Sequence, residues 1–323
     1  MASAARSAWP APRALALLAT LALLALVPPV AGLLHQPFYV ELFRRVMILA
    51  IAAVSLDLIL GYGGMVSFGH AAYLGVGAYA VAVSAHYGVT SGLVQWPLAV
   101  LASMAVAGVI GAISIRTSGL YFIMITLAFT QMLYYLGIGI EEFGGDNGMR
   151  LSTRSQFAGL VPLAHPTVFY YVVLGVLAAA VGLGHRLVNA RFGLVLQGAR
   201  SNEPRMRALG FSTFRYRLAA FAIAGGLGGL AGALLVNQTE YLTPDFMHWT
   251  RSGEIMFMVI LGGMGTLTGP VLGAIALILL ETVLSGWTEH WQGLLGPILV
   301  LVVLFARGGL VGLLPAPRTG AER

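Results

Sequence analysis

The sequence contains a series of apolar segments that are long enough to cross a lipid bilayer. A membrane-spanning helix needs about 20 mostly apolar residues. The segments that qualify are residues 14–34, 46–61, 69–87, 93–115, 118–140, 167–185, 214–237, 268–286 and 291–306, with a shorter apolar piece at 254–264. These lengths predict an all-α fold, a polytopic membrane bundle of about 8–10 transmembrane helices.

The composition excludes an ordinary soluble domain. Apolar residues make up 58% of the 323 residues, and charged residues make up only 9%. Soluble domains carry about 25% charged residues, and a single core could not bury this much apolar surface. Arginine supplies every positive charge, because the chain contains no lysine. We therefore interpret the net charge of +6 as anchoring of membrane helices and not as nucleic-acid binding.

The arginine distribution predicts how the chain is oriented, because arginine-rich loops stay on the cytoplasmic side. Residues 186–217 hold seven arginines against one acid, Glu203, and form a long cytoplasmic loop in this scheme. Residues 141–166 are richer in acids and suit the outer side, as do residues 238–253. The arginines that place the two termini and one further loop in the cytoplasm are Arg6, Arg13, Arg116, Arg307, Arg318 and Arg323.

Two numbers of crossings satisfy this orientation. One is eight full crossings with a re-entrant or broken segment at 254–264, and the other is ten crossings. Arg44 and Arg45 are the exception, since both fall on the outer side.

The first residues have two interpretations. Residues 1–34 resemble a signal peptide, but their apolar run ends at Pro28-Pro29 without a clear small-x-small cleavage site. We expect a retained N-terminal helix, a permease domain over 38–314 and a short basic tail over 315–323.

Two glycine-rich segments interrupt the apolar pattern. Residues 61–77 and 261–273 each contain Gly-Gly-Met, a hydroxyl residue two positions later and a further glycine. Paired interruptions of this kind indicate a substrate path in membrane transporters, while close packing of helices through glycine is the alternative. The residues that we expect to line such a path are Asp57, Gly63, Gly64, Ser67, His70, Thr126, Gln131, Gly262, Gly263 and Thr266.

Some of these polar residues have a structural alternative. Asp57 lies four residues before Gly61, where it would cap the broken segment or sit at the interface. An isolated His70 is more often hydrogen-bonded than part of a proton relay, and Glu281 suits a helix end at the interface. The rows Gly225, Gly229, Ala233 and Gly228, Gly232 have the spacing of helix packing.

The cytoplasmic loop carries a helical pattern of its own. We expect a short helix from about 202 to 209, closed by Gly210 as its C′ residue. Such a helix would present Arg200, Glu203, Arg205 and Arg207 to a soluble partner. The alternative is that the arginines only set the topology.

The missing lysine also bears on chemistry. A Walker A loop needs a lysine on the β- and γ-phosphates, so this chain has no P-loop of its own. The sequence shows no metal-ligand cluster and no catalytic triad, and we expect no enzyme activity and no cofactor in this chain.

Several motifs together resemble one family. They are LDLILGYGGMVSFGHAAYLGVGAYAVA at 56–82, GGDNGM at 144–149, RFGLVLQGARSNEPRMRALGFSTFRYRLAAF at 191–221, VILGGMGTLTGPVLGA at 259–274 and LVVLFARGGLVGLL at 301–314. This series is similar to branched-chain amino-acid ABC importer permeases of the LivM type. Many relatives have an asparagine where this chain has Asp57.

The resemblance implies a type II ABC importer-like permease in the bacterial inner membrane. It implies four kinds of partner besides the lipid bilayer: a second homologous permease, two cytoplasmic ABC ATPases that bind ATP and Mg, and a periplasmic substrate-binding protein. The family's coupling pattern falls on Glu203, Ala208, Leu209 and Gly210. The same machine with urea, a short amide or another small solute stays an alternative, as do an ion-coupled transporter and a membrane-embedded enzyme.

Overall fold

The computed structural model describes residues 11–151, 153–157, 163–288, 290–305 and 308–312. Arg6, Arg307, Arg318, Arg323 and the predicted tail over 315–323 lie outside these residues.

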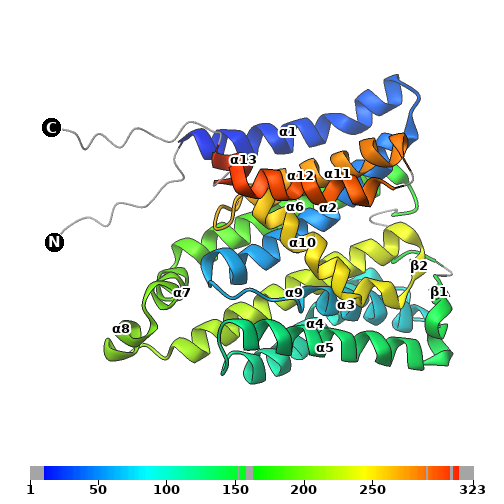
Figure 1. The fold of residues 1–323 in the computed structure, drawn as a ribbon. Coiled ribbons are helices and arrows are strands. Elements are labelled where there is room, and N and C mark those ends of the chain that lie inside the picture. Colours follow the sequence, from blue (N-terminus) through cyan, green and yellow to red (C-terminus); the bar gives the residue numbers. More distant parts are fainter. Residues whose placement is uncertain (1–10, 152, 158–162, 289, 306–307, 313–323) are drawn as a thin grey trace.

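The described chain is a bundle of long helices with short elements at both ends (Figure 1). The long helices are α1 (Ala11–Leu33), α2 (Pro37–Asp57), α3 (His70–His86), α4 (Gly92–Ser114), α5 (Leu120–Gly139), α6 (Pro166–Asn189), α9 (Thr213–Thr239), α10 (Trp249–Gly262), α11 (Gly269–Trp287) and α12 (Trp291–Phe305). The short helices are the π-helical turn η1 (Leu58–Tyr62), α7 (Arg191–Ser201), α8 (Glu203–Ala208), α13 (Gly309–Gly312) and the 3-10 turns η2 (Glu141–Phe143), η3 (Gly145–Asn147) and η4 (Pro244–Met247). Strands β1 (Met149–Arg150) and β2 (Tyr241–Leu242) pair antiparallel, with Met149 opposite Leu242.

The bundle has two distinct ends. Helices α7 and α8 project from one end, which we call the loop end, and the β1–β2 ribbon lies at the other, the ribbon end (Figure 1). Along the chain, α1, α2, α3, α4, α5, α6, α9, α10, α11 and α12 run alternately between the two ends (Figure 1).

Six of the described helices are long and apolar enough to cross a membrane: α1, α4, α5, α6, α9 and α11. The glycine-rich segments explain why two other helices, α3 and α10, are short. Helix α10 has 14 residues, which at about 1.5 Å per residue is less than the roughly 30 Å of a bilayer core. It ends at Gly262, within the second glycine-rich segment, and α3 starts at His70, within the first.

Helix α9 is at the centre of the bundle, and glycine places it there. Of the window that makes it a membrane span, 72% is buried, against at most 44% in the other five helices. A Cβ atom on Gly77 of α3 would overlap the backbone of Gly229, and one on Gly232 would overlap the carbonyl of Leu74. The prediction that the glycine rows of α9 serve helix packing is confirmed.

The two arginines that contradicted the charge pattern each have a partner within the chain. Arg44 of α2 is 1% exposed, and its guanidinium carbon lies 4.9 Å from the centre of the Phe169 ring. Its Nη2 atom is 3.8 Å from Glu41. Arg45 lies 3.6 Å from the carboxylate of Glu281, which is six residues before the end of α11 at Trp287, so the charge of Glu281 has a partner.

Candidate functional site

The two glycine-rich segments lie side by side at the loop end. Asp57 is the last residue of α2, and its Oδ1 atom accepts a hydrogen bond from the backbone N–H of Gly265 at 2.8 Å. Gly61 lies between them, and a Cβ atom there would come within 2.8 Å of the Asp57 carboxylate carbon. The structure therefore brings together two segments that the sequence indicated separately, and the junction needs a glycine at position 61.

Arg200, from the last turn of α7, reaches into this junction. Its Nη1 atom donates a hydrogen bond to the carbonyl oxygen of Gly61. Its stem crosses Gly64, where a Cβ atom would lie 2.7 Å from Arg200 Cγ. Gly64 has a φ of +68°, a backbone conformation that favours glycine. We expected Arg200 to face a soluble partner, whereas its side chain is joined to the glycine-rich segments.

The second glycine-rich segment is packed on its own backbone and on α13. Gly263 has a φ of +118°, and a Cβ atom on it would lie 2.7 Å from the carbonyl oxygen of Gly308. The Thr266 hydroxyl donates to the carbonyl of Gly263 at 2.6 Å, and Gly262 lies against the backbone of Gly269. In this conformation Gly262, Gly263 and Thr266 serve close packing, which was the alternative to a substrate path.

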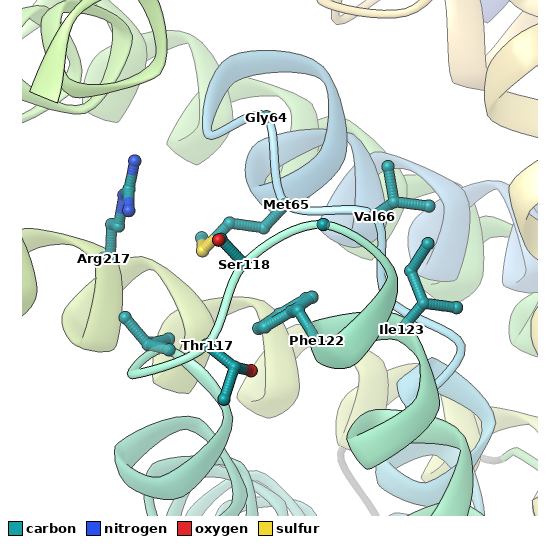
Figure 2. A pocket seen from close by; sticks show the side chains of 10 residues that line it. Gly64, Met65, Val66, Thr117, Ser118, Phe122, Ile123 and Arg217 are labelled. Atoms are coloured by element: carbon teal, nitrogen blue, oxygen red, sulfur yellow. The ribbon is translucent and has the colours of Figure 1, made fainter.

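A small cavity lies beside the first glycine-rich segment (Figure 2). Its volume is about 150 Å³, and its lining comes from the first glycine-rich segment, the α4–α5 connection, α5 and the start of α9. The lining residues are Gly64, Met65, Val66, Ile115, Thr117, Ser118, Gly119, Phe122, Ile123 and Arg217. Apolar side chains thus share the cavity with two hydroxyls, and the guanidinium group of Arg217 in its wall is paired with Glu203. The cavity can hold a small solute that has an apolar and a polar part.

Threonines of α5 hold the end of the first glycine-rich segment. Thr126 Oγ1 accepts from the backbone N–H of Phe68 at 3.2 Å, and Thr130 Oγ1 donates to the carbonyl of Phe68 at 3.2 Å. Ser67 Oγ accepts from the N–H of Gly69 at 3.0 Å. Thr126 and Ser67 therefore hold backbone rather than face an open path, and Gln131 is half-buried on the same helix.

His70 is fully buried at the start of α3. Its Nε2 atom is in hydrogen-bond contact with the hydroxyl of Ser55, and its ring lies edge-on to Tyr73 at 5.6 Å between centroids. These contacts give His70 the structural role that was the alternative to a proton relay.

The cytoplasmic loop contains the short helix that the sequence predicted. Helix α8 covers Glu203–Ala208, within one residue of the expected bounds. The Asn202 side chain caps its start by accepting from the N–H of Arg205 at 3.0 Å. At its end Gly210 has a φ of +87°, and the N–H of Phe211 donates to the carbonyl of Met206 at 3.1 Å. Gly210 is therefore the C′ residue of a Schellman motif.

Glu203 holds α8 on the first turns of α9. Its Oε2 atom lies 2.6 Å from Arg217 Nη1, and its Oε1 atom accepts from Thr213 Oγ1 at 2.9 Å and from Arg207. Partial burial alone would raise the pKa of this carboxyl, but the hydrogen bonds from Thr213 and Arg207 and the charges of Arg217 and Arg207 outweigh it, so the pKa lies below its ordinary value. Glu203 is thus engaged within the chain, whereas we expected it to be presented to a partner.

Other residues of this helix are exposed. Arg205, Arg207, Ala208, Leu209 and Gly210 are all on the surface, and the side chain of Leu209 is 65% exposed. Phe211, 40% exposed, extends the same turn.

Comparisons with known proteins agree with this arrangement. A family model described as "Branched-chain amino acid transport system / permease component" matches residues 38–306. The high-affinity branched-chain amino acid transport system permease protein LivM of Salmonella typhimurium is 28% identical over 298 residues, which cover 84% of this chain and 69% of the relative. The LivM protein of Escherichia coli is 27% identical over the same shares. A probable LivM of Methanocaldococcus jannaschii is 25% identical over 79% of this chain and 85% of its own length.

More distant relatives carry another name. The autoinducer 2 import system permease protein LsrC of Salmonella paratyphi B is 28% identical over 165 residues, which cover 47% of each chain. No solved structure matches the chain. The match to the family model covers the described bundle from α2 through α12, and the chain belongs to the family of branched-chain amino acid transport system permease components.

Proposed function

We propose that this chain is the membrane-spanning permease subunit of an ABC importer for branched-chain amino acids in the bacterial inner membrane. A periplasmic binding protein delivers the amino acid at the ribbon end, and the solute leaves at the loop end. A second homologous permease completes the path, and two cytoplasmic ABC ATPases bind ATP and Mg and supply the energy. The family match and the LivM relatives support the class and the substrate.

The observation that carries the proposal is the position of the cavity. It is lined by Gly64 of the first glycine-rich segment and by Arg217, which is paired with Glu203 of α8, so the cavity lies at the same end as α8. A branched-chain amino acid has an apolar side chain and a polar amino-acid head, and the cavity offers Phe122 and Ile123 for the apolar part. The hydroxyls of Thr117 and Ser118 lie at the same cavity.

The orientation follows from charge. The loop end carries the arginines of residues 186–217 and Arg116, and α1 begins at this end (Figure 1). Arginine-rich loops stay in the cytoplasm, so the loop end and both chain termini are cytoplasmic in this proposal.

The docking surface for an ATPase is the exposed side of α8 with the turn that follows. Leu209 is an exposed apolar side chain beside Arg205 and Arg207, away from the bundle core. Apolar anchors surrounded by charge are typical of protein interfaces. Leu209→Asp should weaken co-purification of the ATPase by about tenfold or more, with Leu209→Met as the matched control. Equal recovery of the ATPase with both variants would contradict this surface.

Reconstitution tests the function directly. The chain would be co-expressed with the permease, ATPases and binding protein encoded in neighbouring reading frames, and uptake of labelled leucine into liposomes would be measured. We expect uptake that needs ATP and the binding protein, and no accumulation by this chain alone under an ion gradient. Accumulation by this chain alone would support an ion-coupled transporter and overturn the proposal.

The relatives named for autoinducer 2 import favour a second candidate, the same permease role for another small polar solute. Competition separates the two candidates. Unlabelled leucine, isoleucine and valine should abolish the uptake, whereas uptake that only urea, short amides or sugar-like solutes suppress would assign the second.

A further inference from the structure

Arg200 connects the ATPase-facing loop to the glycine-rich junction through a very short stretch of chain. It lies in the last turn of α7, two residues before Asn202, which caps α8. The N–H of Asn202 donates to the carbonyl of Gly198 at 2.9 Å, and its side chain accepts from Arg205 at 3.0 Å. Because both helices are hydrogen-bonded to the residue that joins them, a displacement of α8 also moves the end of α7.

The far end of the Arg200 side chain is hydrogen-bonded to backbone, and its charge interacts with the carboxylate of Asp57. Its guanidinium donates to the carbonyl of Gly61 in the π-helical turn η1, and its Nη1 atom would lie 3.9 Å from a Cβ atom on Gly265. Gly61 and Gly265 are themselves close, and Asp57 binds the N–H of Gly265 at 2.8 Å. One side chain from the loop thus reaches the place where both glycine-rich segments meet.

The junction of the two glycine-rich segments is tightly packed. The Arg200 stem lies over Gly64, and a Cβ atom at that position would come within 2.7 Å of it. Gly64 also lines the cavity at the loop end. A movement of Arg200 therefore has to displace Gly61, Gly64 or both, and Gly64 is part of the cavity wall.

We propose that Arg200 is the positioning residue that transmits movement of α8 to the glycine-rich junction and so opens the cavity at the loop end. The inference rests on the proposed function, because it assumes that an ATPase moves α8. Within this proposal Arg200 does not contact the solute. It acts on the backbone of Gly61, and Gly265 follows because Asp57 ties it to the end of α2.

A purely topological arginine would behave differently. For topology a positive charge anywhere in the loop suffices, and Arg186 at the end of α6 supplies one at the same end of the bundle. Transmission requires a donor that reaches the Gly61 carbonyl and a stem that lies on Gly64. Arg200→Met keeps the stem and removes the donor, Arg200→Lys keeps a charged donor, and Arg186→Met removes an exposed arginine as the matched control.

The first experiment measures coupling in the reconstituted complex. Assembly, ATP hydrolysis and leucine uptake are recorded for each variant, and the ratio of uptake to hydrolysis is compared. We expect Arg200→Met to assemble and hydrolyse ATP while this ratio falls by about tenfold, the size of a lost hydrogen bond to a charged donor. Arg200→Lys should restore most of the ratio, and Arg186→Met should leave it unchanged. A normal ratio in Arg200→Met would overturn the proposal.

The second experiment does not depend on that variant folding. The chain contains no cysteine, so Met264→Cys, at a side chain that is 50% exposed beside the junction, introduces a single labelling site. In the otherwise unchanged complex, its rate of labelling by a maleimide should change when a non-hydrolysable ATP analogue binds. A rate that does not respond to the nucleotide would overturn the proposal even if Arg200→Met fails to assemble. Failure of this inference can be distinguished from failure of the proposed function. If the proposed function is wrong, the unaltered complex does not take up leucine.

Discussion

The hydroxyl of Tyr170 donates a hydrogen bond to the carbonyl oxygen of Leu24 at 2.7 Å. Leu24 lies four residues before Pro28 within α1, and proline has no N–H to offer that carbonyl. The next pair repeats the arrangement, since Tyr171 donates to Ala25 at 3.2 Å and Ala25 lies four residues before Pro29. Two consecutive tyrosines of α6 thus replace the donors that two consecutive prolines of α1 remove.

This relationship predicts how α1 is held on the bundle. Tyr170→Phe leaves the Leu24 carbonyl without a donor in apolar surroundings, which should cost about 1–3 kcal/mol. We expect a lower melting temperature in detergent and faster proteolysis of α1. Tyr171→Phe is the control with the smaller effect, because Tyr171 is 43% exposed and Tyr170 is fully buried.

The mass of the intact purified protein tests whether the N-terminal helix is retained. A mass that includes residues 1–34 would support the retained helix, and a protein lacking them would contradict it.

Glu203 predicts a pH dependence of the loop. Its pKa is lower in the folded protein than the ordinary value, so its contacts with Arg217, Arg207 and Thr213 stabilise the loop fully above the unfolded pKa. That contribution is lost as the pH falls through the folded pKa. The protection of the α8 amides against hydrogen exchange, relative to their intrinsic exchange rate at each pH, should therefore fall on acidification below about pH 4.

Glu203→Gln is the matched control for this pH dependence. It should be less protected than the unaltered protein at neutral pH and should lack the acid-dependent loss of protection. The same loss of protection in both proteins would show that another group is responsible.

Asp57 should be needed for its oxygen and not for its charge. Asp57→Asn retains an Oδ1 acceptor for the N–H of Gly265, whereas Asp57→Leu removes it and leaves that N–H without its side-chain partner. We expect near-normal uptake in Asp57→Asn and a loss of about tenfold or more in Asp57→Leu. Loss of uptake in both, with normal amounts of folded protein, would indicate that the carboxylate charge itself takes part in transport.

The cavity predicts a block by a large side chain. Ser118 is exposed on the α4–α5 connection and faces the cavity in Figure 2. Ser118→Trp should fill much of the 150 Å³ and reduce uptake, while the amount of assembled complex stays normal. Ser118→Thr is the control that keeps the hydroxyl. Normal uptake in the tryptophan variant would separate this cavity from the solute path.

The parts of the site that depend on local rules could be predicted from the sequence. Gly210 closes α8 because a left-handed residue after a helix favours glycine, and Asn202 begins it as a polar cap. The membrane bundle followed from segment length and charge, which also need no knowledge of distant neighbours.

The contacts between distant residues could not be predicted. Arg200 and Gly61 are 139 residues apart, and Asp57 and Gly265 are 208 residues apart. Both hydrogen bonds join a side chain to backbone, and the backbone partner is not marked in the sequence. Glu203 was expected on the surface for a different reason, because a single acid among seven arginines does not show which of them it pairs with; its partners Thr213 and Arg217 lie ten and fourteen residues later. Gly262 and Gly263 were assigned to a path because glycine alone does not distinguish a cavity wall from a close backbone approach.

The hydrogen bonds of Thr126 and Thr130 to residue 68 predict which amino-acid substitutions the chain tolerates. Thr126 accepts from the N–H of Phe68 and Thr130 donates to its carbonyl, so the contact does not depend on which side chain stands there. A saturation library at position 68 should therefore recover most amino acids in functional clones and be depleted in proline, the one residue without the N–H. At positions 126 and 130 the same library should retain serine and threonine and lose valine, although valine has nearly the same shape as threonine.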